Sequence, residues 1–164
     1  IDLSYVGPSP ALNAFVRSKG KALCVLSGAV RGGAGLVVRP QNPLPVKPRD
    51  FIGKRIATPQ VGNTQDIACR AWLKEAGLQV SLSGGEVRVM PTANADMVQF
   101  MQQGTIDAAW TVEPWLSRLE LEAGAKLVHA EAQETSISTI LVASKQLLMN
   151  KPNWFAALCW PTAN

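Results

Sequence analysis

Residue types that many catalytic and metal sites require are scarce in this chain of 164 residues. There is a single histidine, His129, so a Ser-His-Asp or Cys-His site would have to use it, and no G-x-S-x-G motif accompanies it. The three cysteines, Cys24, Cys69 and Cys159, are too few for a disulfide scaffold, and no two of them have the spacing of metal ligands. We therefore expect no catalytic residue, no metal site and no cofactor, and we predict that the protein is not an enzyme.

Long apolar runs are missing as well, because none approaches the ~18 residues that a transmembrane helix requires. The chain has 16 Lys+Arg and 12 Asp+Glu, a net charge of +4, and an apolar share of 47%, which excludes a disordered polyampholyte. A basic cluster, Lys47, Arg49, Lys54 and Arg55, is interleaved only by Phe51. We interpret this cluster as a solvated loop and expect no nucleic-acid partner.

One unit recurs along the sequence: a short apolar strand, a turn of small or polar residues, an amphipathic helix and a glycine. We expect strands over 1–6, 54–58, 87–91, 106–110 and 126–130, and helices ending near residue 19 and over 64–76, 95–103 and 113–123. Asn63 or Thr64 and Asn94 are expected to cap their helices, and Pro114 to lie in a first helical turn. Because strands and helices alternate, the sequence predicts an α/β fold with a parallel sheet and helices on both faces.

Two stretches break this pattern. An extended segment over 22–38 leads into 40–48, where four prolines exclude a central strand or a helix, and we interpret it as a link between two folding units. A second extended segment, 135–144, is interpreted as a return crossing. The expected division is therefore 36–138 as one lobe, with 1–35 and 139–164 as parts of the other.

Ligands of open parallel sheets bind outside the carboxyl ends of the strands, so the strand-to-helix turns are the candidate sites. The turn 60–64 is the richest, because small residues let the backbone approach a ligand and a helix N-terminus favours an anion. Ordinary capping by Asn63 or Thr64 is the alternative explanation. Ser9, in the turn after the first strand, offers the same choice between a cap and a ligand contact.

Two further turns offer hydroxyls. Ser27 and Gly28 could present a hydroxyl and a backbone N–H to a ligand. Thr111 or Glu113 could contact a ligand at a helix start, although Glu113 most simply complements the helix dipole there. Trp115 beside them is more often a core residue than a ligand platform.

Three motifs together resemble the substrate-binding proteins of ABC importers for nitrate, aliphatic sulfonates and taurine. They are YVGPSPA at 5–11, IATPQVGNTQD at 56–66 and DAAWTVEPW at 107–115. The similarity runs from residue 1 to about residue 150 and implies a two-lobed, type II periplasmic-binding-protein-like fold. Lobe two would be nearly complete and lobe one partial. The resemblance places the ligand-binding residues at Ser9, Ser27, Gly28, Gln60, Asn63, Thr64, Thr111 and Glu113.

The resemblance implies a solute-binding component that holds a small anionic solute between its lobes and delivers it to ABC transporter permease subunits. The location implied is the periplasm, or the outer face of the cell membrane through a lipid anchor. Two alternatives stay open: a thiamine-precursor pyrimidine or other aromatic solute stacked on Trp110 or Trp115, and an effector-sensing domain of a transcription regulator.

A full member of that family is nearly twice as long as this chain, which begins at Ile1, so we expect a fragment. The segment 153–164 does not resemble the family's continuing helix. An incomplete lobe one is expected to expose apolar surface and to promote self-association of the fragment.

Overall fold

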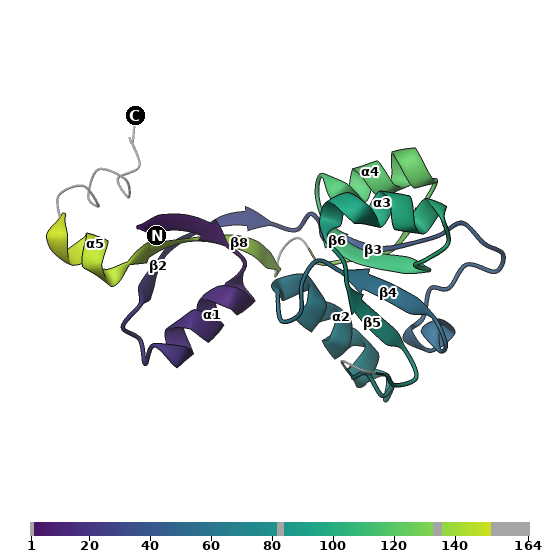
Figure 1. The fold of residues 1–164 in the computed structure, drawn as a ribbon, viewed down its shortest axis with the longest axis horizontal. Coiled ribbons are helices and arrows are strands. Elements are labelled where there is room, and N and C mark those ends of the chain that lie inside the picture. Colours follow the sequence, from purple (N-terminus) through teal and green to yellow (C-terminus); the bar gives the residue numbers. More distant parts are fainter. Residues whose placement is uncertain (1, 82–83, 133–135, 152–164) are drawn as a thin grey trace. The chain divides into compact units, whose positions relative to one another are not determined.

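The computed structural model describes residues 2–81, 84–132 and 136–151 of the chain (Figure 1). The segment 153–164 lies outside the described residues. The chain divides into two compact units: Ile1–Arg31 with Ile137–Asn164, and Gly32–Ser136. Within the part of the chain that is described, no helix combines the length and the hydropathy needed to cross a membrane.

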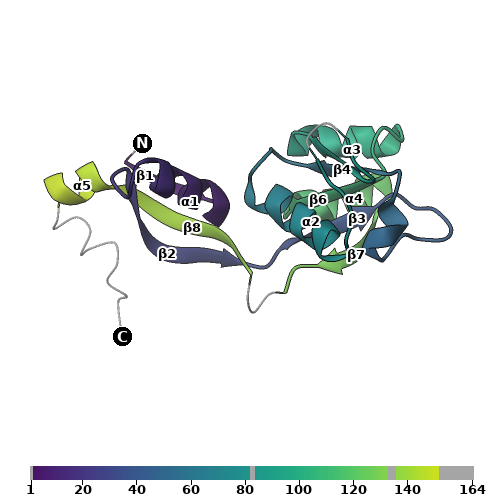
Figure 2. The ribbon, with the colours of Figure 1, turned by 90° about the horizontal axis from the view of Figure 1, so that it is seen from below.

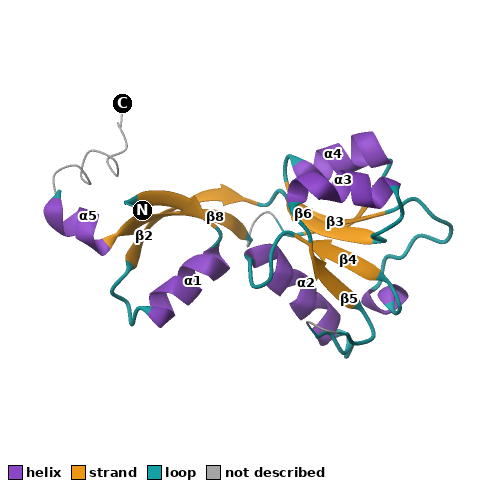
Figure 3. Ribbon diagram, viewed as in Figure 1, coloured by secondary structure: helices purple, strands orange, loops and turns teal. Residues whose placement is uncertain are grey.

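The first unit is an antiparallel sheet with one helix on it (Figure 3). Its elements are β1 (Leu3–Val6), α1 (Pro8–Arg17), β2 (Leu23–Arg31), β8 (Ile137–Ser144) and α5 (Lys145–Asn150). β8 lies between β1 and β2 and pairs antiparallel with both. The small core beneath α1 consists of Ala11, Ile140 and Val142, with Val6 and Leu23 partly buried against it.

The second unit is built on a five-stranded mixed sheet. Its strands are β3 (Ala34–Val38), β4 (Arg55–Thr58), β5 (Arg88–Pro91), β6 (Ala108–Val112) and β7 (Lys126–Ala130), in the order β5-β4-β6-β3-β7. β4 is parallel to β5 and β6, as expected, whereas β3 is antiparallel to both of its neighbours. β3 follows β2 directly and not a helix, so it is not the product of a right-handed crossover.

Helices cover both faces of this sheet (Figures 1 and 2). They are α2 (Thr64–Glu75) on one face and α3 (Asn94–Gln102) and α4 (Trp115–Ala123) on the other. The core beneath α2 consists of Leu36, Val38, Phe51, Ile56, Cys69, Leu73, Leu78, Val87, Val89, Ala108 and Trp110. The core beneath α3 and α4 consists of Val37, Ala57, Met97, Val98, Met101, Ile106, Ala109, Leu116, Leu119 and Ala125.

The proline-rich stretch 40–48 lies inside the second unit, between β3 and the short 3-10 helix η1 (Pro48–Phe51). The prediction that it links the two units is therefore wrong. The chain passes between the units after Arg31, from β2 to β3, and after Ser136, from β7 to β8. Both positions lie a few residues before the expected bounds of the second lobe, 36 and 138. Extended strand-to-strand crossings need no proline, so the prolines of 40–48 did not mark the first crossing, whereas the second falls within the extended segment 135–144 that was expected to contain it.

One of the three predicted helix N-termini in the second unit has the expected cap, and the other two differ by one position. Asn63 is the N-cap of α2, and its Oδ1 accepts the backbone N–H of Asp66 at 2.8 Å, which confirms the predicted cap. Asn94 does not cap α3: Ala93 is the N-cap and Asn94 is the first helical residue, with its Oδ1 bonded to β6 instead. Pro114 is the N-cap of α4, one position ahead of the expected first turn.

Candidate functional site

The three parallel strands of the second unit end at one edge of the sheet, and the helices that follow them begin there. β4 ends at Thr58, β5 at Pro91 and β6 at Val112. β3 begins at the same edge, because Ala34 pairs with Val112, and β7 ends there. This is the edge at which open α/β sheets bind ligands. We call it the carboxyl edge, comprising residues 32–34, 58–65, 91–94, 111–115 and 130–131.

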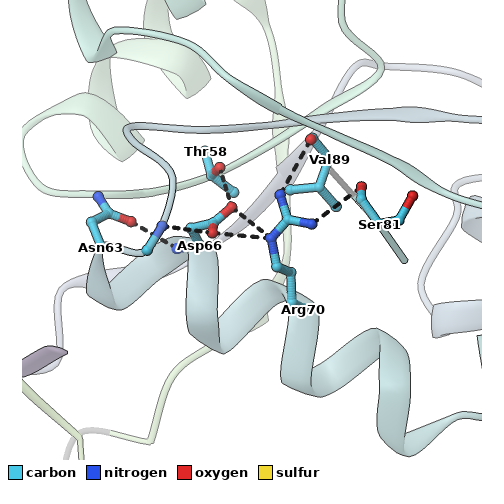
Figure 4. A network of polar contacts seen from close by, with 7 residues as sticks. Thr58, Asn63, Asp66, Arg70, Ser81 and Val89 are labelled. Atoms are coloured by element: carbon cyan, nitrogen blue, oxygen red, sulfur yellow. Dashed lines mark hydrogen bonds and ion pairs between the residues drawn. The ribbon is translucent and has the colours of Figure 1, made fainter. Parts of the chain in front are cut away.

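The turn between β4 and α2 is held by the carboxylate of Asp66, whose side chain is 2% exposed (Figure 4). Its Oδ1 accepts the hydroxyl of Thr58, at the end of β4, at 2.9 Å. Its Oδ2 accepts the backbone N–H of Gly62, within the turn, at 2.9 Å. One side chain therefore ties the end of the strand, the turn and the first turn of the helix together.

Arg70 balances the charge of Asp66 from one helical turn further along. Its Nε donates to both carboxylate oxygens at 3.0 Å, and its terminal nitrogens reach the backbone oxygens of Ser81 and Val89 at 3.4 Å (Figure 4). Burial alone would raise the pKa of Asp66, but the hydrogen bonds from Arg70, Gly62 and Thr58 outweigh it and lower the pKa. The carboxylate is thus an internal brace of the turn.

A second brace joins β6 to α3. The hydroxyl of Thr111, which is fully buried, donates to Oδ1 of Asn94 at 2.7 Å. The next turn is held by Glu113, whose backbone N–H donates to the carbonyl of Gly33 at 2.8 Å and whose Oε2 accepts the N–H of Ser117 at 3.2 Å. Both predicted residues of this turn therefore have partners within the protein.

An aromatic cluster lies behind the carboxyl edge on the α2 face. The ring of Trp110 packs against Trp72 and His129, with centroids 5.6 and 5.2 Å apart, and its Nε1–H donates to Glu131 at 2.8 Å. Trp110 is only 1% exposed, so its ring belongs to the core and has no free face for an aromatic solute. Stacking on Trp110, one of the two tryptophans named for the aromatic-solute alternative, is incompatible with this burial.

The charges of the carboxyl edge are few. It contains two carboxylates, Glu113 and Glu131, and neither lysine nor arginine. Both carboxylates accept hydrogen bonds from the protein. An anion bound here would be held by N–H and hydroxyl dipoles and by the helix N-termini.

Residues 1–160 match the model of the NMT1-like family. The chain belongs to the NMT1-like family. No curated protein sequence matches it significantly.

Solved structures of binding proteins share the fold of this NMT1-like chain. The periplasmic aliphatic sulphonate binding protein SsuA from Escherichia coli has a TM-score of 0.76 and 19% identity, over 96% of this chain and 52% of that chain. The alkanesulfonate-binding protein SsuA from Xanthomonas axonopodis pv. citri, bound to MOPS, has a TM-score of 0.75 and 23% identity, over 96% and 52%. The periplasmic nitrate-binding protein NrtA from Synechocystis PCC 6803 has a TM-score of 0.71 and 16% identity, over 97% and 44%.

These likenesses confirm the predicted fold class, an α/β fold of the periplasmic-binding-protein type with a sheet flanked by helices. The NMT1-like chain spans about half the length of these proteins. All three are named as binding proteins and not as enzymes, which is the class that the sequence predicted.

The predicted ligand-binding residues of the NMT1-like chain fall into two groups. Those of the second unit all lie on the carboxyl edge: Gln60, Asn63, Thr64, Thr111 and Glu113. In the first unit, Ser9 lies in the first turn of α1, after the end of β1. Ser27 and Gly28 are exposed within β2, and the pairing of β2 with β8 is irregular on both sides of them. Such bulges are frequent beside binding sites.

Sequence reasoning missed residues that shape the edge. Asp66 stands in the motif at 56–66 with no predicted role of its own, yet it organises the turn before α2. Asn94 was expected to be a cap, and it anchors Thr111. Gln65, which no sequence pattern singles out, is buried at the start of α2. Only burial distinguishes Asp66 and Gln65 from solvated polar residues of a first helical turn, and only the distant partner Thr111 distinguishes Asn94; sequence spacing reveals neither.

Proposed function

We propose that this chain is the solute-binding component, or part of it, of an ABC import system. Its ligand would be a small oxyanion such as an aliphatic sulfonate, taurine or nitrate, passed on to the permease subunits of the importer. The protein would act in the periplasm, or on the outer face of the cell membrane if a lipid anchors it. Membership of the NMT1-like family and the fold shared with sulfonate- and nitrate-binding proteins support this proposal.

The observation that carries the proposal is the convergence of three helix N-termini on the carboxyl edge. Each N-terminus presents backbone N–H groups that have no partner within the helix, together with the positive end of the helix dipole. An oxyanion offers only acceptor atoms, so it fits a surface of converging donors. Sulfonates and nitrate stay ionised at every physiological pH, and a site for them needs no proton-transferring group.

The predicted residues are proposed as ligand contacts on this basis. In the second unit these are Gln60, Asn63, Thr64, Thr111 and Glu113. The first unit would contribute Ser9, Ser27 and Gly28. Asn63 uses its Oδ1 inside the protein and keeps its amide NH₂, which can donate to an oxyanion. Thr111 has given its hydroxyl proton to Asn94 and can only accept, as can the carboxylate of Glu113, so these two would contact a donor group of the solute such as the ammonium of taurine.

Titration calorimetry of the full chain with ethanesulfonate, taurine and nitrate tests the proposal, with sodium chloride at equal ionic strength as the control. We expect saturable, one-to-one binding of at least one of the three oxyanions. No heat with any of them would overturn the proposed function. Binding of a pyrimidine without binding of any oxyanion would favour the aromatic-solute alternative.

A further inference from the structure

Gln65 is a buried residue whose side-chain amide makes no hydrogen bond to the described residues. It is the second residue of α2 and is 6% exposed. Neither its side-chain amide nor its backbone N–H has a hydrogen-bond partner among the described residues. The amide atoms are not among the fully enclosed atoms that lack a partner, so the side chain is held in a buried position while its amide stays open to a molecule from outside the chain.

The position of Gln65 on the helix directs its side chain toward the carboxyl edge. Cys69 and Trp72 follow it by four and seven residues, so the three share one side of α2. Cys69 is fully buried in the core beneath α2, and Trp72 packs on Trp110, so this side faces the sheet. Side chains of a helix lean toward its N-terminus, and the N-terminus of α2 lies at the carboxyl edge.

The side-chain oxygens of Asn63 and Asp66, on either side of Gln65 in the sequence, already accept hydrogen bonds within the protein. Oδ1 of Asn63 caps the helix, and the carboxylate of Asp66 bonds to Thr58, Gly62 and Arg70. The charge of Asp66 is therefore balanced inside the protein and does not oppose an anion beside Gln65. Gln65 is left with a backbone N–H and an amide NH₂ near the positive end of the helix dipole.

We infer that Gln65 is a ligand-contacting residue that binds the oxyanionic head group of the solute. Its backbone N–H and its amide NH₂ donate to two oxygens of the same group, a sulfonate in the case of an alkanesulfonate. This inference rests on the proposed function and names a residue of that site which the sequence motifs did not single out.

Two substitutions test the inference in the full chain. Gln65→Met keeps the size of the side chain and the backbone N–H but removes the amide donors, and Gln65→Glu replaces them with a negative charge. With whichever of ethanesulfonate, taurine and nitrate binds the unsubstituted chain, we expect Gln65→Met to bind about tenfold to a hundredfold more weakly. Gln65→Glu is expected to weaken binding further at pH 7. Gln99→Met, at an exposed glutamine of α3, is the matched control and should not change the affinity.

A stability measurement separates a ligand contact from a packing residue. Because the amide makes no bond to the described residues, the urea midpoint of Gln65→Met should equal or exceed that of the unsubstituted chain. A midpoint that falls along with the affinity would overturn the inference, since Gln65 would then be structural. In the unsubstituted protein labelled with ¹⁵N, the side-chain NH₂ resonances of Gln65 should shift on addition of ethanesulfonate, taurine or nitrate, whichever binds.

The outcomes distinguish this inference from the proposed function. If the unsubstituted chain binds an oxyanion and both variants bind it equally well, or the Gln65 resonances do not move, the inference is overturned and the proposed function stands. If the unsubstituted chain binds none of the three anions, both are overturned.

Discussion

Asp66 is the residue on which the turn before α2 depends most directly, since it bonds to the strand, the turn and the helix at once. Asp66→Ala would leave Arg70 without its carboxylate and Thr58 and Gly62 without an acceptor. We predict a loss of about 3–5 kcal/mol in the free energy of unfolding, measured with urea, as is usual when one member of a buried ion pair is removed. Asp96→Ala, at an exposed acid in the first turn of α3, should cost about 1 kcal/mol or less. Equal losses for the two variants would contradict the bracing role.

Two carboxylates make the stability sensitive to acid. Burial alone would raise the pKa of Asp66 and of Asp107, but hydrogen bonds from Arg70 and Arg55 respectively outweigh it, and both pKa values lie below the ordinary 3.8. Because the folded-state pKa is the lower one, the stabilisation is complete above about pH 4 and is lost as the pH falls through the folded-state value. We predict that the urea midpoint falls as the pH is lowered below about 4, and that Asp66→Asn and Asp107→Asn each make this fall shallower. An unchanged slope in both variants would contradict the assignment.

At the scale of elements, the end of β6 is tied to the start of α3 by the hydrogen bond from the hydroxyl of Thr111 to Asn94. Thr111→Val keeps the shape of the side chain but leaves Oδ1 of Asn94 without its donor. We predict a loss of about 1–3 kcal/mol in the free energy of unfolding, measured with urea. Thr105→Val, at an exposed position, should stay within about 0.5 kcal/mol. In the double variant with Asn94→Ala the two losses should not add, and full additivity would contradict a direct bond.

Element by element, the sequence predicted what local chemistry decides. Asn63 caps α2 as expected, because a cap needs only the residue and the helix behind it. Asn94 fits the same local rule, yet its oxygen bonds to Thr111, a partner 17 residues away that no local pattern contains. The antiparallel direction of β3 likewise depends on where the chain enters the second unit. The strands β4, β5 and β6 are parallel, as the sequence predicted, and this brings the five predicted ligand residues of that unit to one edge of the sheet. Gln65 could be recognised only from its burial.

The two units differ in how much apolar surface they bury. Among the described residues, the two clusters of the second unit hold eleven and ten buried residues, and the cluster of the first unit holds three. On the first unit Tyr5, Leu12, Val16 and Val25 are all more than half exposed. Since the free energy of local opening follows buried apolar contact, the first unit of this chain should open more easily than the second.

Hydrogen exchange measured by mass spectrometry checks this at the level of the whole molecule. β8 and β6 make a matched pair, because each lies between two neighbours in its own sheet. We predict that amides of β8 exchange at least about tenfold faster than those of β6 under native conditions. Val142→Ala, in the core of the first unit, should accelerate exchange in β1, β2 and β8 and leave β6 unchanged, whereas Val37→Ala should accelerate exchange in the second unit. Equal protection of β8 and β6, with both variants affecting both strands, would mean that the two units open as a single cooperative body.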